Sequence, residues 1–215
     1  MEKINIEYIK EKLKNSYDVK YREIECNVGT IYGIFIDDLC DSKFISEYIF
    51  KPLIQYKIDT VNLEYIKKEI LPANSIGDVK DDDDAIYHVL SGDLVLVFSF
   101  TNKSFYCEAK GYVRRSVGIP VTESVIKGPR EGFTEAFVDN VSLIRRKIKD
   151  PSLKFETVIL GSKSNTVIVI CYIEGVAPNK LVDYIRKKVT NIKLEFILDT
   201  NYIEEALKNK NTPFD

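Results

Sequence analysis

The hydrophobic pattern of this chain breaks once, over residues 112–130, and resumes afterwards. The segment contains Gly118, Pro120, Gly128 and Pro129 but no sustained apolar repeat. Strand-like and helix-like stretches alternate on both sides of it, and a Gly- and Pro-rich stretch between periodic segments is typical of a loop. The sequence therefore predicts an α/β (α+β) chain of two small α/β subdomains, with mixed or antiparallel sheets, joined by a linker. The expected parts are an N-terminal subdomain over 1–111, a linker or arm over 112–130 and a C-terminal subdomain over 131–215.

The spacing of apolar residues predicts the elements of each subdomain. In the first, we expect helices over 4–14, 43–50, 62–71 and 82–90, and strands over 21–27, 30–36, 94–100 and 104–109. In the second, we expect a hairpin of strands 155–160 and 166–173, helices over 179–189 and 202–207, and a strand over 194–198. The helix over 43–50 is expected to end before Pro52, because proline breaks the hydrogen bonding of a helix interior.

A longer helix is expected to follow the linker. Its apolar face recurs at steps of four or three residues, at Phe133, Phe137, Val141, Ile144 and Ile148. Pro129 suits the first helical turn, and Pro151 ends the helix.

The carboxyl end of this helix is basic. Arg145, Arg146 and Lys147 complement the negative end of a helix dipole, so we expect a solvated basic face. The alternative is a salt bridge that anchors the helix to another subdomain.

Composition excludes several classes of protein. Lys and Arg number 31 and Asp and Glu 33, which gives a net charge of −2 and argues against a nucleic-acid binder. The residues after Met1 are charged, so no signal peptide is expected. The longest uncharged apolar stretches fall far short of the roughly 20 residues that a spanning helix needs.

Few residues suit catalysis or metal binding. His88 is the single histidine, and its apolar neighbours favour a structural or surface role over a catalytic one. The glycine spacing excludes both the dinucleotide-binding fingerprint and the P-loop, and no Cys-x-x-Cys pair exists. We therefore expect no catalytic residue, no metal and no cofactor.

The turn before the predicted long helix contains Gly128, Pro129 and Arg130. A helix N-terminus beside an arginine can bind an anion. The favoured interpretation is simpler: Gly and Pro build a turn, and Arg130 pairs with a carboxylate such as that of Glu123.

This stretch resembles the GerA family of spore germination proteins. The matching residues of 125–149 read V-I-K-G-P-R-E-G-F-T-E-x₄-N-x₂-L-I-R-R-K-I-K, and the stretches Y-I-E-G-V-A-P-N-K-L-V and I-L-D-T-N-Y-I-E-E are similar too. The resemblance is dense over 112–206 and weak over 1–110. Lys127 stands where the family pattern has arginine, which keeps the charge but loses bidentate geometry.

The resemblance implies a role in nutrient sensing. The chain would be the N-terminal soluble domain of the A subunit of a spore germinant receptor, a non-enzymatic module that couples nutrient sensing to ion release. Membrane helices would follow residue 215, and this domain would lie on the cytosolic, spore-core side of the inner membrane. The implied partners are a transporter-like B subunit, a lipoprotein C subunit and further copies in a homo-oligomer, with no nucleic acid.

The alternative function is weak binding of a small-molecule germinant in a cleft between the subdomains. On the main interpretation, the turn, arm and helix dock subdomains or subunits to each other. The candidate interface residues are Arg114, Arg115, Glu123, Lys127, Gly128, Pro129, Arg130, Glu131, Phe133, Asn140, Arg145 and Arg146. Replacing Arg145 and Arg146 by alanine is then expected to impair germination while leaving a folded domain.

Overall fold

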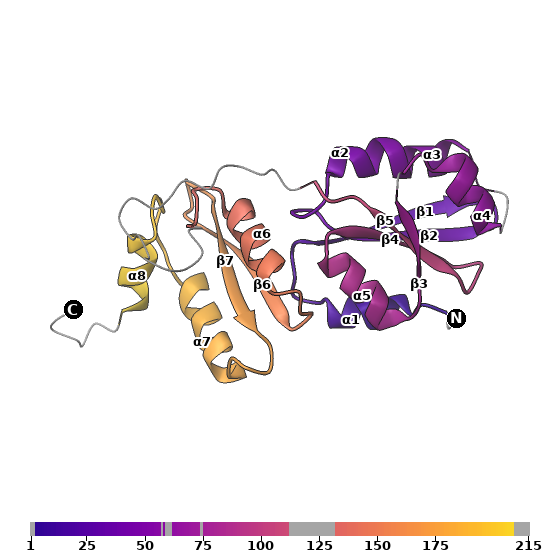
Figure 1. Ribbon diagram of the computed structural model, residues 1–215. Helices are drawn as coiled ribbons and strands as arrows, with labels where there is room; N and C mark the ends of the chain where they lie inside the picture. The colour runs from indigo at the N-terminus through magenta and orange to yellow at the C-terminus, as the bar shows by residue number, and fades with distance from the viewer. Residues whose placement is uncertain (1–2, 57, 59–61, 74, 112–131, 209–215) are drawn as a thin grey trace, which may run out of the picture. The chain divides into compact units, whose positions relative to one another are not determined.

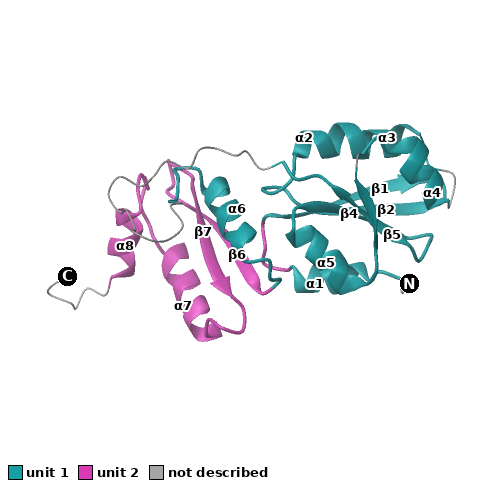
Figure 2. Ribbon diagram, viewed as in Figure 1, with its two compact units in different colours: residues 1–13, 18–151 teal, residues 14–17, 152–215 magenta. Residues whose placement is uncertain are grey.

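The structure, a computed structural model, describes residues 3–56, 58, 62–73, 75–111 and 132–208. These residues form two compact units (Figure 2). Unit 1 comprises residues 1–13 and 18–151, and unit 2 comprises residues 14–17 and 152–215. The division differs from the expected one in two places: residues 14–17 group with the C-terminal unit, and residues 132–151 group with the N-terminal unit. The predicted linker over 112–130 lies outside the described residues.

Unit 1 is built on a five-stranded antiparallel sheet with the order β1-β2-β4-β5-β3. Its strands are β1 (Val19–Cys26), β2 (Gly29–Ile36), β3 (Ile76–Val79), β4 (Asp93–Phe98) and β5 (Ser104–Glu108). All six residues of β4 are buried, because helices cover both faces of the sheet at this central strand. The four expected strands are therefore confirmed within a few residues, and β3 is an additional short strand.

Helices cover the two faces of this sheet with different residues (Figure 1). On one face lie α1 (Ile6–Lys12) and α5 (Asp82–Leu90), whose apolar side chains pack on Val95 and Val97. On the other face, Leu94, Leu96 and Phe98 of the same strand pack under helical segments that contain π-turns. These are α2 (Ser42–Phe44), η1 (Ile45–Phe50), α3 (Lys51–Gln55), α4 (Leu63–Tyr65) and η2 (Ile66–Ile70).

The expected end of the second helix before Pro52 is wrong. α2, η1 and α3 run continuously over 42–55, with Pro52 in the first turn of α3. The backbone N–H of Lys51 bonds to the carbonyl of Ser46, five residues earlier. In an α-helix the proline ring clashes with the carbonyl four residues before it, and the wider π-turn changes that spacing.

Unit 1 also includes α6 (Phe137–Lys147), which is shorter than the expected helix. Thr134 and Asn140 form a closed pair: the Thr134 N–H donates to Asn140 Oδ1 at 2.7 Å, and Asn140 Nδ2 donates to the Thr134 carbonyl at 2.8 Å. These bonds hold the preceding residues in a turn, and Ala136 is extended. The helix consequently begins at Phe137, and Phe133 is not on its apolar face.

Unit 2 contains the antiparallel hairpin of β6 (Leu153–Leu160) and β7 (Thr166–Ile173), together with α7 (Asn179–Thr190) and α8 (Asn201–Leu207). These four expected elements are confirmed. Residues 14–17 join β6 through a parallel bridge between Ser16 and Phe155. Two backbone bonds of 3.1 Å, from Tyr17 N–H to the Phe155 carbonyl and from Phe155 N–H to the Asn15 carbonyl, flank that bridge.

The expected strand over 194–198 is wrong. Its backbone does hydrogen-bond, but to the turn between β6 and β7: Ser162 N–H donates to Leu194, and Lys163 N–H to Glu195. Because a tight turn cannot continue a ladder, the segment lies against the hairpin without becoming a strand. Ile197 is nevertheless buried with Leu160 and Val189 in the core of unit 2.

Candidate functional site

A buried ion pair within unit 1 joins the end of α6 to the residue that precedes β1. Arg145 Nε donates to Asp18 Oδ2 at 3.0 Å, and Nη2 donates to Oδ1 at 3.1 Å. The side chain of Arg145 is 1% exposed and that of Asp18 is fully buried. The two residues are 127 positions apart in the sequence. A bidentate guanidinium–carboxylate pair of this kind fixes both distance and orientation.

This geometry changes the interpretation of the basic helix end. Arg145, Arg146 and Lys147 do occupy the last turn of α6, where cations complement the helix dipole. The solvated face expected for Arg145 is wrong, since the residue is buried. A salt bridge does form, but it lies within unit 1 and does not anchor the helix to another subdomain, as the alternative had it. Arg146 is partly buried, and Lys147 is exposed.

The other candidate interface residues divide into two groups. Phe133 is 72% exposed, and the side chain of Asn140 forms two hydrogen bonds with the backbone of Thr134. The rest lie outside the described residues: Arg114, Arg115, Glu123, Lys127, Gly128, Pro129, Arg130 and Glu131. An interface role for all of these residues stays a prediction.

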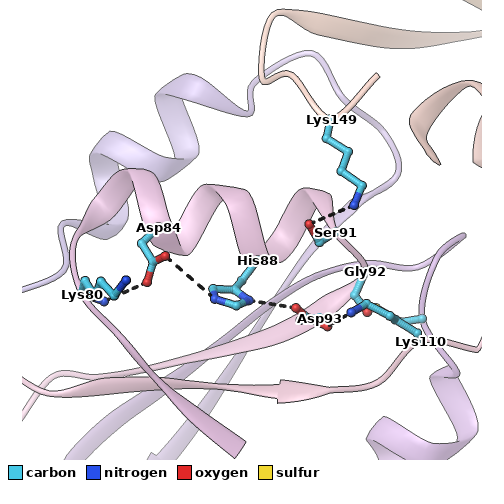
Figure 3. Close-up of polar contacts among 9 residues, drawn as sticks. Lys80, Asp84, His88, Ser91, Gly92, Asp93, Lys110 and Lys149 are labelled. Carbon is cyan, nitrogen blue, oxygen red and sulfur yellow. Dashed lines mark hydrogen bonds and ion pairs between the residues drawn. The ribbon is translucent and has the colours of Figure 1, made fainter. Parts of the chain in front are cut away.

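His88 lies on α5 between two carboxylates of unit 1 (Figure 3). Its Nδ1 is 2.8 Å from Asp93 Oδ2, and its Nε2 is 3.9 Å from Asp84 Oδ1. Its ring stacks on Tyr106 of β5, with centroids 3.5 Å apart. Lys110 completes the cluster with an ion pair of 3.1 Å to Asp93 Oδ1. The histidine thus connects α5 to two strands of the sheet, as the expected structural role requires.

Cys40 lies beside this cluster and hydrogen-bonds to the backbone. Cys40 Sγ donates to the Gly92 carbonyl at 3.3 Å. Burial raises the pKa of the Cys40 thiol to about 12, so the thiol stays protonated at neutral pH. A nucleophilic Cys–His pair needs a thiolate beside the imidazole, and this arrangement lacks it. Among the described residues, no group of three or more His, Cys, Asp or Glu side chains is placed to hold a metal ion.

Unit 2 has its own polar cluster around Glu156 of β6. Arg186 of α7 donates from Nε to Oε2 at 2.8 Å and from Nη2 to Oε1 at 2.9 Å, while Tyr172 Oη donates to Oε1 at 2.6 Å. The Arg186 hydrogen bonds are the main reason that the pKa of Glu156 is lowered. Burial and the contact with Glu156 raise the pKa of Tyr172 to about 12. The cluster therefore links the hairpin to α7 through an ionised carboxylate.

We expect Glu156 to make the free energy of unfolding decrease as the pH becomes acidic. Because the folded pKa lies below the unfolded value of about 4.3, the stabilisation is present above that value and is lost as pH falls through the folded pKa. Glu156→Gln is therefore expected to be less stable than wild type at pH 7, and the gap in the free energy of unfolding is expected to narrow as the pH falls below about 4.3. Urea unfolding followed by circular dichroism at both pH values measures this. Glu205→Gln, on α8, is the matched control, and a gap that stays constant with pH would contradict the assignment.

None of the helices over the described residues combines the length and the apolar character that crossing a bilayer requires. The family model described as "Bacillus/Clostridium GerA spore germination protein" matches residues 7–215. Spore germination protein KA of Bacillus subtilis is 30% identical over 211 residues, which cover 96% of this chain and 39% of that protein. Spore germination protein GerLA of Bacillus cereus is 26% identical, over 96% of this chain and 43% of that protein.

A solved structure agrees with these sequence matches. The crystal structure of the N-terminal domain of the A subunit of the Bacillus megaterium spore germinant receptor GerK3 superposes with a TM-score of 0.70 at 26% identity. The match covers 98% of this chain and 79% of that chain. This chain spans about two fifths of the length of the curated relatives named above. The match over residues 7–215 shows that the chain belongs to the GerA family of spore germination proteins.

Proposed function

We propose that this chain is the N-terminal domain of a spore germinant receptor A subunit, a non-enzymatic module that couples nutrient sensing to ion release. The observation that carries the proposal is the likeness over 98% of the chain to the N-terminal domain of such a subunit. The coverage of about two fifths of each relative supports a longer protein that continues past residue 215. That remainder would hold the membrane helices, with this domain on the cytosolic, spore-core side of the inner membrane.

The proposed partners are the B and C subunits of the receptor and further copies of the A subunit. Docking to these partners, or between subdomains, is assigned to the arm over 114–129 and to the stretch over 128–149 that contains the turn and the helix. Phe133 is the best probe of this surface among the described residues, since a 72% exposed aromatic ring contributes little to a core. Buried Arg145 is a poor probe, because its loss would act on folding.

The test begins in spores of the bacterium that encodes the full-length protein, in a strain whose other germinant receptor genes have been removed. Deleting this gene is expected to abolish germination with particular nutrients, and the wild-type gene is expected to restore it. Germination that continues unchanged after the deletion would contradict the receptor function.

Complementation with Phe133→Ser then tests the docking surface. The variant is expected to accumulate normally and to germinate poorly, because the exposed ring is lost from a contact with a partner. Tyr56→Ser is the matched control, since Tyr56 is a similarly exposed aromatic residue of unit 1 outside these two stretches. Equal germination of the two variants would remove Phe133 from the docking surface.

A second candidate function is binding of a small-molecule ligand by this domain. The observation that favours it is a positively charged groove within unit 1.

A further inference from the structure

A groove of about 630 Å³ lies at the edge of the sheet in unit 1. It runs between the edge strand β1 and the helical segments η1 and α3. Cavities of roughly 300–1,000 Å³ are the usual size of small-molecule sites in proteins. The groove is therefore large enough for a ligand of a dozen or so non-hydrogen atoms.

The floor of the groove is apolar and aromatic. Phe35 and Phe50 are each 9% exposed, and their ring centroids lie 6.1 Å apart. Ile54, which is half exposed, continues this surface along α3. Gly33 on β2 lets the Phe50 ring lie on the sheet, since a Cβ there would be 2.7 Å from Phe50 Cε1. The close packing of the Phe50 ring on Gly33 therefore fixes the position of the groove floor.

The rim of the groove is positively charged. Lys20 and Arg22 come from β1, Lys51 comes from the start of α3, and the lining includes no carboxylate. Arg22 and Lys51 have no ion-pair partner among the residues that the structure describes. Glu47 belongs to η1 but does not line the groove. The phenol of Tyr21, another lining residue, is uncharged at neutral pH, and burial raises its pKa further, to about 12.

Protection of a sheet edge explains only part of this arrangement. Charged side chains on an edge strand discourage pairing with other strands, which accounts for Lys20 and Arg22. It does not account for Lys51, which lies on a helix, or for the two aromatic rings that line the same groove. A recessed floor also distinguishes the groove from a surface that lies flat on a membrane.

We propose that this groove binds a small carboxylic acid with a compact apolar body, whose carboxylate meets Arg22 and Lys51 while its body packs on Phe35 and Phe50. The cations supply charge-assisted hydrogen bonds to the carboxylate. The rings supply apolar contact and discriminate against strongly hydrated anions such as phosphate. This inference is argued from unit 1 alone and does not depend on the coupling role proposed above.

The binding test compares two probes of nearly equal shape on the 215-residue chain. 3-Phenylpropionate carries the carboxylate, and 3-phenylpropionamide replaces it with a neutral amide. In a ¹⁵N-resolved NMR titration, the acid is expected to cause saturable shifts at Arg22, Phe35, Phe50 and Lys51, with a Kd of about 1 mM or below. The amide is expected to bind at least tenfold more weakly. Equal affinity for both probes, or no saturable shift with the acid, would overturn the proposal.

Charge reversal tests the two cations directly. Arg22→Glu/Lys51→Glu is expected to weaken binding of the acid at least tenfold, whereas Lys103→Glu, in the turn between β4 and β5, is expected to leave it unchanged. Circular dichroism establishes that the double variant is folded, and the acid–amide comparison on wild type decides the question if it is not. An unchanged affinity in a folded double variant would also overturn the proposal.

A vesicle-binding experiment distinguishes a small-molecule site from a membrane-binding surface. Wild type and double variant are sedimented with vesicles of phosphatidylglycerol and phosphatidylcholine. Vesicle binding that depends on Arg22 and Lys51, in a protein that shows no saturable shift with 3-phenylpropionate, would assign the patch to a lipid surface and reject the ligand site. Failure of the nutrient-response experiment would leave this result intact, because neither readout here depends on germination.

Discussion

Arg145→Ala is expected to lower the free energy of unfolding by about 3–5 kcal/mol, the usual cost of removing one partner of a buried ion pair. The substitution leaves the Asp18 carboxylate buried without the two guanidinium hydrogen bonds that it accepts in the native state. Desolvation of that charge is then uncompensated, which is more costly than the loss of the contact itself. Urea unfolding followed by circular dichroism measures the change.

Two further variants isolate the ion pair as the cause. Lys147→Ala changes an exposed residue in the same last turn of α6 and is expected to stay within about 0.5 kcal/mol of wild type. Asp18→Leu/Arg145→Met replaces both charges by apolar side chains and is expected to be more stable than either single variant. Additive losses in the double variant would show that the two side chains act separately.

This prediction corrects one expectation drawn from the sequence. The basic helix end suggested that alanine at Arg145 and Arg146 would leave a folded domain and disturb only docking. Since Arg145 is 1% exposed, a germination defect in that variant would report on folding first.

Phe98→Ala is expected to cost about 3–5 kcal/mol, as large-to-small substitutions of buried aromatic residues do. Phe98 is fully buried on the central strand β4, and its ring centroid lies 5.0 Å from that of Phe105 and 5.6 Å from that of Phe100. Truncation opens a cavity beneath the helices that contain π-turns, and the two remaining rings lose their aromatic neighbour. The midpoint and slope of urea unfolding measure the loss.

Phe98→Leu is the matched control for this cavity. Leucine keeps most of the apolar volume, so its loss is expected to be clearly smaller than that of alanine. Tyr56→Ala removes an aromatic ring that is 63% exposed and is expected to change stability by less than about 0.5 kcal/mol. Similar losses for Phe98→Ala and Tyr56→Ala would mean that Phe98 is not part of a tightly packed core.

The local sequence pattern was sufficient to predict most helices and strands of this fold. The helix over 82–90 has acidic residues in its first turn and a capping Asp81 side chain that accepts from the Asp84 N–H, so the start of this helix was predictable. The three hairpins, β1–β2, β4–β5 and β6–β7, were predictable because strand-like runs are separated by short turns. β3 was missed, since four residues with a central glycine give too little alternation to distinguish a strand from a loop.

The candidate site was less predictable than the fold. Arg145 was singled out by the motif, but its partner Asp18 was not, because nothing in the residues around position 18 indicates a contact 127 positions away. The Glu156–Arg186 pair was missed for the same reason, as each residue alone resembles an ordinary surface charge. The groove of unit 1 depends on Gly33 and on the continuation of a helix through Pro52, and the second of these contradicts the local rule.

The path of the chain between the two units restricts how relatives of this domain can exchange parts. Residues 14–17 belong to unit 2, although they lie in the sequence between two segments of unit 1. Ser16 pairs with Phe155 in unit 2. A hybrid gene with a single crossover between positions 18 and 151 would therefore join a bridging segment from one parent to a hairpin from the other. Recombination that transfers unit 2 intact needs one crossover near codon 151 and a second near codons 14–17. We therefore expect functional hybrids between family members to carry both crossovers.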